Sequence, residues 1–151
     1  MPLTDPLARP RRRAACAVLA LLLAAPAGAA RAACQVAVDP VAFGTIDPTR
    51  ESTGTGRVVV TCDAATTTSV ALSAPGGGRT LAGPGGAAIF YELYQDVART
   101  TRWGDGGFRP ARGASVGSAE PSRLTIYGVI PSQTGVVPGG YLDQLQVTLT
   151  F

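Results

Sequence analysis

The C-terminal eleven residues, Tyr141–Phe151, constrain the fold more than any other stretch of this 151-residue chain. Apolar side chains recur there at every second position, and Gln and Thr fill the positions between them. A period of two is typical of a strand with one face in a core and the other in water. Pro138 and two glycines precede the segment as a turn signal. The apolar residues of this predicted strand are Leu145, Val147, Leu149 and Phe151.

The given sequence ends with this strand, so no later segment is available to pair with its second edge. We expect that edge to be covered by an earlier strand, as in a complete sandwich, to be covered by a partner, or to stay open. Leaving several apolar side chains half-covered costs on the order of 1 kcal/mol each. An unpaired apolar edge also promotes aggregation. The pattern therefore favours a dedicated partner.

The first 32 residues have the organisation of a secretory signal peptide. Four arginines between positions 9 and 13 precede the apolar run Ala14–Ala25, and small residues follow as far as Ala33. A run of twelve residues is too short to cross a bilayer, which takes roughly 20. We predict a signal peptide over residues 1–32, no membrane span, and a mature domain over residues 33–151.

Two cleavage sites fit the small residues near the end of this segment. Cleavage after Ala29 or Ala32 leaves small residues at the required spacing. A lipoprotein anchor on Cys34 is a competing interpretation, but Arg31 occupies a position where that signal has an aliphatic residue.

Removal of the signal peptide reverses the charge of the chain. The 13 basic residues are all arginines, against ten acids, and there is no lysine or histidine. Cleavage after Ala32 removes five arginines and Asp5, so eight arginines and nine acids remain, a net charge of −1. The mature chain therefore gives no electrostatic reason to expect nucleic-acid binding. Its length, close to 120 residues, fits one domain with a single core.

The cysteines give the same indication of export. Cys16 leaves with the signal peptide, and Cys34 and Cys62 remain as an even pair in an exported chain, where we expect a disulfide. Closing a loop of about 29 residues stabilises the fold by roughly 3–4 kcal/mol. Two cysteines without histidine cannot form a closed zinc site, so we expect a structural bond and no metal.

Turn-forming residues divide the mature chain into short segments rich in β-branched and aromatic residues. The predicted strands are Cys34–Val38, Val41–Thr45, Thr55–Cys62, Ser69–Ser73, Thr80–Ala82, Ala88–Val97, Leu124–Val129 and Tyr141–Phe151. We expect Asp39 and Pro40 to end the first strand, and residues 104–117 to form a glycine-rich loop. Strands separated by turn signals every 8–12 residues or so predict an all-β, antiparallel sandwich of Greek-key type.

The residues of catalytic sites are largely missing. Without histidine or lysine the chain has no Ser-His-Asp, Cys-His or Schiff-base chemistry. Glu92 and Asp96 could lie on one face as the paired carboxylates of a glycoside hydrolase, but we expect both to be solvated. Trp103–Gly107 could bind calcium or sugar, although a glycine turn closed by a packed Trp fits better. We therefore expect no enzyme, no catalytic residue and no cofactor.

Several blocks of the mature chain resemble, in order and spacing, the spore coat protein U domain family. The blocks are Cys34, Phe43–Gly44, Asp47–Pro48, Cys62, Tyr94, Trp103–Gly106, Tyr127–Gly128, Pro138–Asp143 and Val147–Phe151. The last two are the most specific. This family includes subunits of archaic chaperone–usher pili.

The resemblance implies an incomplete immunoglobulin-like antiparallel β-sandwich that lacks its final strand. A periplasmic chaperone would supply the strand first, and a neighbouring pilus subunit would replace it after passage through an outer-membrane usher. The donor-strand groove would lie beside Leu145, Val147, Leu149 and Phe151. The chain would then be exported to the periplasm and reach the cell surface in a fimbrium that serves adhesion, biofilm formation or a coat.

One feature departs from the pattern of a polymerising subunit. Only Ala33, or at most Ala30–Ala33, lies between the expected cleavage site and Cys34, whereas a donor segment needs roughly ten residues or more. We therefore expect a tip or terminator subunit that accepts a strand and gives none. The glycine-rich stretches 76–86 and 104–117 are candidate surface-contact loops. The alternatives are a stand-alone secreted coat-type structural domain or a small carbohydrate-binding sandwich.

Overall fold

A computed structural model describes residues 32–75, 78–104, 112–116 and 120–151. The expected signal peptide up to residue 31 and residues 105–111 of the glycine-rich loop lie outside these ranges. Within them the chain forms nine strands and one 3₁₀ turn, with no helix of the length and apolar character needed to cross a membrane.

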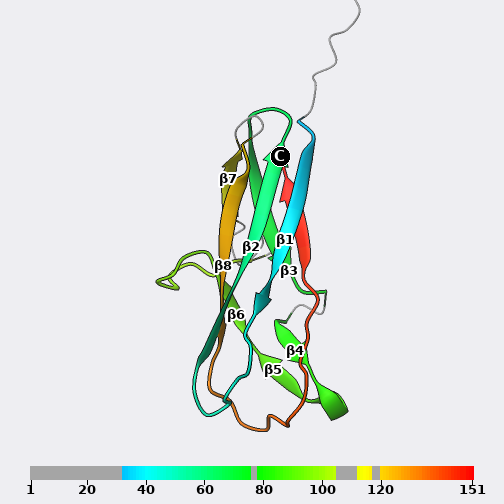
Figure 1. Ribbon diagram of the computed structural model, residues 1–151, viewed down its shortest axis with the longest axis vertical. Helices are drawn as coiled ribbons and strands as arrows, with labels where there is room; N and C mark the ends of the chain where they lie inside the picture. Colours follow the sequence, from blue (N-terminus) through cyan, green and yellow to red (C-terminus); the bar gives the residue numbers. More distant parts are fainter. Residues whose placement is uncertain (1–31, 76–77, 105–111, 117–119) are drawn as a thin grey trace, which may run out of the picture. The chain divides into compact units, whose positions relative to one another are not determined.

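The strands form two main antiparallel sheets and one small one (Figure 1). The first sheet has the order β1 (Cys34–Ala42), β2 (Ser52–Cys62), β8 (Ser122–Ile130) and β6 (Glu92–Tyr94). The second has the order β7 (Arg112–Val116), β3 (Thr66–Ser73) and β9 (Gln146–Thr150). The small sheet pairs β4 (Thr80–Ala82) with β5 (Ala88–Phe90) across the 3₁₀ turn η1 (Pro84–Gly86). The prediction of an all-β antiparallel fold is confirmed.

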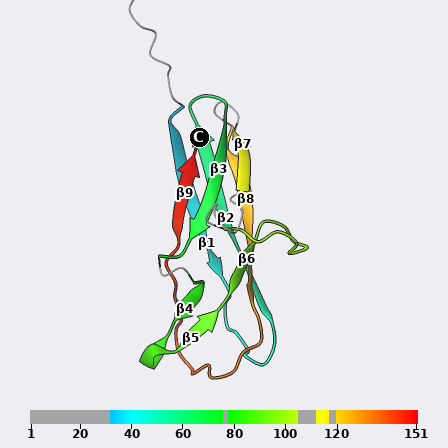
Figure 2. The same ribbon diagram turned by 180° about the vertical axis from the view of Figure 1, so that it is seen from behind.

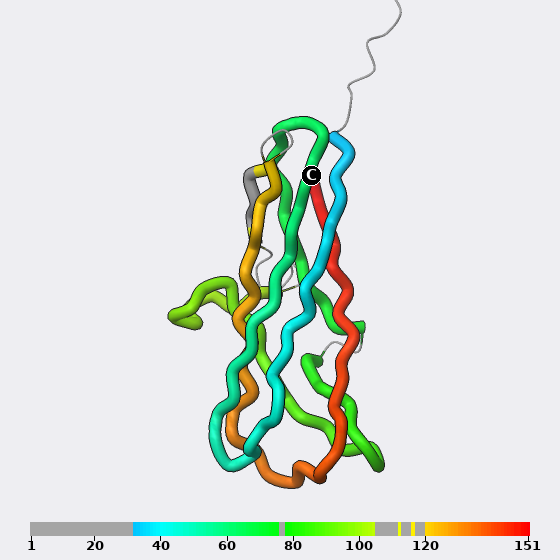
Figure 3. Tube along the Cα trace, in the orientation of Figure 1, coloured from blue at the N-terminus to red at the C-terminus, as the bar shows by residue number. Residues whose placement is uncertain are grey.

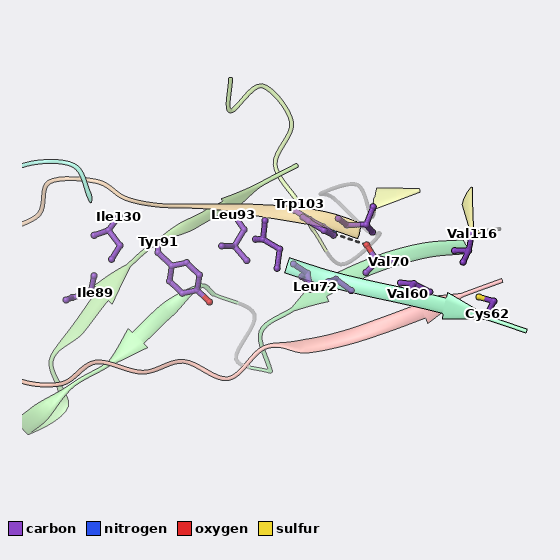
Figure 4. Close-up of a cluster of buried hydrophobic side chains, with 13 residues drawn as sticks. Val60, Cys62, Val70, Leu72, Ile89, Tyr91, Leu93, Trp103, Val116 and Ile130 are labelled. Atoms are coloured by element: carbon purple, nitrogen blue, oxygen red, sulfur yellow. Dashed lines mark hydrogen bonds between the residues drawn. The ribbon is translucent and has the colours of Figure 1, made fainter. Parts of the chain in front are cut away.

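The core lies between the two main sheets and follows from the alternation in their strands. Over the central part of β2, β3 and β8, alternate residues are apolar and buried, as expected for strands with one face in a core. Figure 4 shows Val60, Val70, Leu72 and Ile130 from these strands together with Trp103. The inward residues that are at most 5% exposed include Val58, Val60, Val70, Leu72, Leu124 and Ile126.

Trp103 links the two sheets through the middle of the core. Its side chain is fully buried, and its Nε1–H donates to the carbonyl of Val70 in β3 at 2.8 Å (Figure 4). Its backbone N–H donates to the carbonyl of Leu93 in β6, also at 2.8 Å. The buried guanidinium of Arg79 donates to the carbonyls of Trp103 and Leu72, at 2.6 and 2.9 Å. The prediction of a packed Trp at the entrance of the glycine-rich stretch therefore agrees with the structure.

The expected break at Asp39 and Pro40 is wrong, because β1 continues as far as Ala42. Its register with β2 shifts between Asp39, opposite Arg57, and Ala42, opposite Thr55. This irregularity absorbs Pro40, and β1 is an edge strand, where a missing N–H is tolerated.

Several other boundaries differ from the predicted ones, and the predicted strand Ala88–Val97 is divided between β5 and β6, which belong to different sheets. β7 falls inside the predicted glycine-rich loop, and the Arg112 side chain at its start donates to the carbonyls of Gln95 and Thr125. The final strand begins at Gln146 rather than at Tyr141. The preceding segment pairs instead with β4, since the backbones of Leu142 and Ala82 exchange hydrogen bonds of 2.7 and 3.0 Å.

Candidate functional site

β1 and β9 lie side by side without being paired. Figures 1 and 2 show the two strands adjacent from opposite sides, and the tube in Figure 3 shows the C-terminal segment running along the N-terminal one. β9 pairs only with β3 and β1 only with β2 among the described strands, so each is the edge of its sheet. On the opposite side of the sandwich, β7 contacts β8. The described fold is therefore open at its β1–β9 side.

The core-facing side chains of β1 are poorly covered. Val36 pairs with Val60 and Val38 pairs with Val58, and residues directly opposite in an antiparallel pair share a face of the sheet. Val58 and Val60 are fully buried, whereas Val36 is 41% and Val38 is 48% exposed. The face that forms the core at β2 is thus left open at β1.

The same asymmetry occurs in the other sheet. Val70 and Leu72 of β3 are buried, with exposures of 0% and 2%. Their partners across the pair, Leu149 and Val147 of β9, are only half-buried. Both edge strands therefore turn apolar side chains toward a space that described residues fill incompletely.

A cavity of about 190 Å³ occupies this space, and we call it the β1–β9 groove. Its walls come from β1, from β9 with the residues just before it, and from the core behind them. The lining residues are Val38, Asp39, Pro40, Val41, Phe43, Leu72, Leu81, Tyr91, Ile126, Asp143, Leu145 and Val147. An open apolar groove flanked by two unpaired strand edges can take up an added strand.

The four residues predicted for the groove take different positions. Leu145 and Val147 line it. Leu149 packs against the core without being among the lining residues. Phe151 lies beyond the end of β9 and is 68% exposed.

Sequence reasoning did not assign the opposite wall of the groove. Val41 lies at the end of β1 and Phe43 directly follows the strand, and the ring of Phe43 meets that of Tyr91 edge-on, with centroids 6.0 Å apart. The alternation of Val41 and Phe43 was an available signal. The irregularity in β1 that turns them inward was not visible in the sequence.

One end of the groove is polar. The hydroxyl of Tyr91, a residue only 4% exposed, donates to Oδ2 of Asp143 at 2.5 Å. Burial raises the pKa of the Tyr91 phenol well above its usual range, and the hydrogen bond to Asp143 acts in the same direction. The phenol therefore keeps its proton and stays a donor to the carboxylate.

The first strand is tied to the second at its N-terminal end. Cys34 and Cys62, the cysteines paired in the sequence analysis, form a disulfide and face each other in the register of β1 and β2. Beside it, the backbone N–H of Ala33 donates to Oδ1 of Asp63 at 2.8 Å. These bonds hold the start of β1 against the end of β2.

The two carboxylates considered as candidate catalytic groups, Glu92 and Asp96, take part in contacts that stabilise the local structure. Asp96 accepts the backbone N–H groups of Thr100 and Thr101 at 3.0 and 2.9 Å, and these bonds lower the pKa of its carboxyl. Glu92, on β6, lies 3.9 Å from the Arg102 guanidinium. Across the described ranges, no group of three or more His, Cys, Asp or Glu side chains could hold a metal. Asp105 of the proposed calcium or sugar loop lies outside the described residues.

Fold and groove together define a class of protein, namely an antiparallel β-sandwich with an open side bordered by two strand edges. Comparison with known proteins agrees. The family model described as Spore Coat Protein U domain matches residues 19–148, so the chain belongs to this family. Protein U of Myxococcus xanthus is 32% identical over 129 residues, which cover 72% of this chain and 70% of that protein.

A solved structure shares the fold. It is a chain in the crystal structure of the CsuC–CsuE chaperone–tip adhesion subunit pre-assembly complex from archaic chaperone–usher Csu pili of Acinetobacter baumannii. The TM-score is 0.57 at 17% identity, over 80% of this chain. This chain spans only 40% of the length of that one.

Proposed function

We propose that this protein is a structural subunit of a chaperone–usher-assembled surface fibre and accepts a donor strand in the β1–β9 groove. A periplasmic chaperone provides the strand first, and a neighbouring subunit provides it in the fibre, after export through an outer-membrane usher. The chain acts in the periplasm and then at the cell surface, without catalytic activity or a cofactor.

The observation that carries this proposal is the burial asymmetry across both edge pairs. Val36 and Val38 are about half exposed beside fully buried partners, and Val147 is only half-buried beside Leu72. A strand laid between β1 and β9 would cover these side chains and satisfy the outward backbone groups of both edges. Covering apolar area contributes roughly 25 cal/mol per Å², and backbone pairing adds affinity to it.

Family and fold support the same assignment. The match to the Spore Coat Protein U domain spans most of the chain, and the similar solved chain belongs to a chaperone–subunit complex of a pilus. That structure concerns another protein at 17% identity, so the partners proposed here rest on the groove and on the family together.

Co-expression in a bacterial periplasm tests the proposal. We expect the chain to co-purify in a one-to-one complex with a chaperone of the chaperone–usher class, and to aggregate or be degraded when produced alone. Hydrogen exchange in the complex should slow at the amides of β1 and β9. A chain that is soluble, monomeric and equally protected without any chaperone contradicts the proposal.

That contrary outcome is the signature of the second candidate, a stand-alone coat-type structural domain. The family description and the relative Protein U favour it. In that case a segment of the same chain would cover Val38 and Val147. The exchange experiment separates the two candidates because only a fibre subunit needs another molecule to protect both edges.

We further propose a tip or terminator position for this subunit. The support is the short stretch of Ala30–Ala33 between the expected cleavage site and Cys34. Mass determination of the exported chain should find its first residue at Ala30 or Ala33. A start well upstream would leave room for a donor segment and remove the reason for this assignment.

A further inference from the structure

The β1–β9 groove contains a hydrogen-bonded pair in an otherwise apolar wall. The Tyr91 hydroxyl donates to Oδ2 of Asp143, and Oδ1 of Asp143 accepts the backbone N–H of Gln144 at 2.8 Å. Asp143 is half-buried, so its carboxylate is reachable from the groove. Leu81 and Leu145 line the same cavity. Any strand that fills the groove along its length meets this pair.

The pair can only accept further hydrogen bonds. A phenol has one proton, and that of Tyr91 is already donated to Asp143. An ionised carboxylate has no proton and about four lone-pair sites, more than the bonds from Tyr91 and Gln144 occupy. An apolar occupant would displace water here without replacing its hydrogen bonds, which is unfavourable. The occupant must therefore bring a donor.

Charge narrows the choice of donor. The charged residues that line the groove are Asp39 on β1 and Asp143 before β9, and both are acidic. Apart from Tyr91, the other lining residues are apolar. In a partly desolvated groove an opposite charge is attracted more strongly than in water, and a charge-assisted hydrogen bond is stronger than a neutral one. A cationic side chain satisfies both the hydrogen-bonding and the charge requirement.

We propose that the strand that fills the β1–β9 groove carries a lysine or arginine at the inward position that reaches Tyr91 and Asp143, with apolar residues at its other inward positions. This inference rests on the proposed function and specifies the partner's chemistry. The apolar positions would meet Leu72, Ile126 and Val147, and the cation would fix the register in which the strand binds.

Synthetic strands provide the test. A parent peptide of about ten residues alternates valine at inward with threonine at outward positions. Three further peptides carry a single lysine at the first, the central or the last inward position. Because the first and last positions are both tested, the scan covers either strand direction. Each peptide competes with a fluorescent parent peptide for the full chain, refolded with its disulfide formed.

We expect lysine at one terminal inward position to bind about tenfold tighter than the parent, and central lysine to bind about tenfold more weakly. Glutamate at the favoured position should bind more weakly than valine. Asp143→Asn should remove the preference for lysine over valine, measured as the ratio of lysine-peptide to parent-peptide affinity on that variant. Comparing the lysine peptide with the parent peptide on the same protein variant corrects for any general loss of folding.

The outcomes distinguish this inference from the proposed function. If the parent peptide binds and neither terminal lysine improves on it, the groove accepts strands but the cationic position is wrong. The peptide scan on the unchanged chain decides this even if Asp143→Asn does not fold. If no peptide binds, the inference fails together with strand acceptance.

Discussion

The ring of Phe43 lies directly over the backbone of Gly128. A Cβ on Gly128 would be 2.7 Å from Cζ of Phe43 and 2.8 Å from Cγ1 of Val41. Gly54, which pairs with Gly128 across β2 and β8, is equally crowded, with an added Cβ 2.5 Å from the carbonyl oxygen of Ala42. The missing side chains let the end of β1 lie across the sheet. The β1 wall of the β1–β9 groove thus depends on two glycines that lie outside it.

Gly128→Ala should destabilise the fold by about 1–3 kcal/mol, because the new methyl group overlaps the Phe43 ring and forces the end of β1 outward. Chemical denaturation measures the loss. Gly140→Ala is the matched control, since nothing lies within 4 Å of an added Cβ there. Alanine normally suits a strand better than glycine does, so an unchanged or raised stability of Gly128→Ala would contradict the close packing.

The strands that the sequence predicted best are those in which alternate residues are apolar and pack into the core. Thr55–Cys62 was predicted as a central strand from its β-branched residues, and it forms most of β2 between β1 and β8. The alternation of Leu145, Val147 and Leu149 likewise located the segment of β9. In both cases the local sequence pattern was enough to predict the strand, because the alternating apolar residues are those that pack against the core.

The groove could be predicted only in part. Its β1 wall depends on the shift in register between Asp39 and Ala42. In the sequence, Pro40 predicts the end of a strand at this point, not a continuing strand with an irregular register. Arg112–Val116 lies inside the glycine-rich stretch 104–117, whose composition predicts a loop, but it forms β7 by pairing with β3, which is distant in sequence. The Tyr91–Asp143 hydrogen bond joins residues 52 apart, so no local pattern indicates it.

Trp103→Phe tests the link between the two sheets. Phenylalanine keeps most of the apolar contact but removes the Nε1–H that donates to the Val70 carbonyl. A buried carbonyl left without its donor costs about 1–3 kcal/mol. Circular dichroism during urea unfolding measures the loss, since this substitution removes the single tryptophan of the chain. A free energy of unfolding within about 0.5 kcal/mol of the parent's would mean that the hydrogen bond contributes little.

Cys62→Ser should lower the free energy of unfolding by roughly 2–5 kcal/mol, because the unfolded chain loses the cross-link to Cys34. Thermal unfolding with and without reductant measures it. The parent should melt at a lower temperature in reductant, whereas the variant should melt at the same temperature in both conditions. A variant that melts like the oxidised parent would show that the bond does not stabilise the fold.

Val147→Asp places a charge in the β1–β9 groove, which Val147 lines as a half-buried side chain. Bringing a strand over an unpaired carboxylate costs several kcal/mol, so chaperone capture should fall by more than about tenfold. Co-purification from the periplasm with a chaperone of the chaperone–usher class measures capture, and immunoblotting measures how much chain accumulates.

Thr148→Asp is the control, because Thr148 is the next residue of β9 and is exposed on the opposite face. It introduces the same charge one residue further along the strand, so capture of this variant should stay within about twofold of the parent's, as is usual for surface substitutions. Equal losses in both variants would indicate a general weakening of β9. If both variants were captured by the chaperone as well as the parent, the side chains lining the groove would play no part in binding a strand.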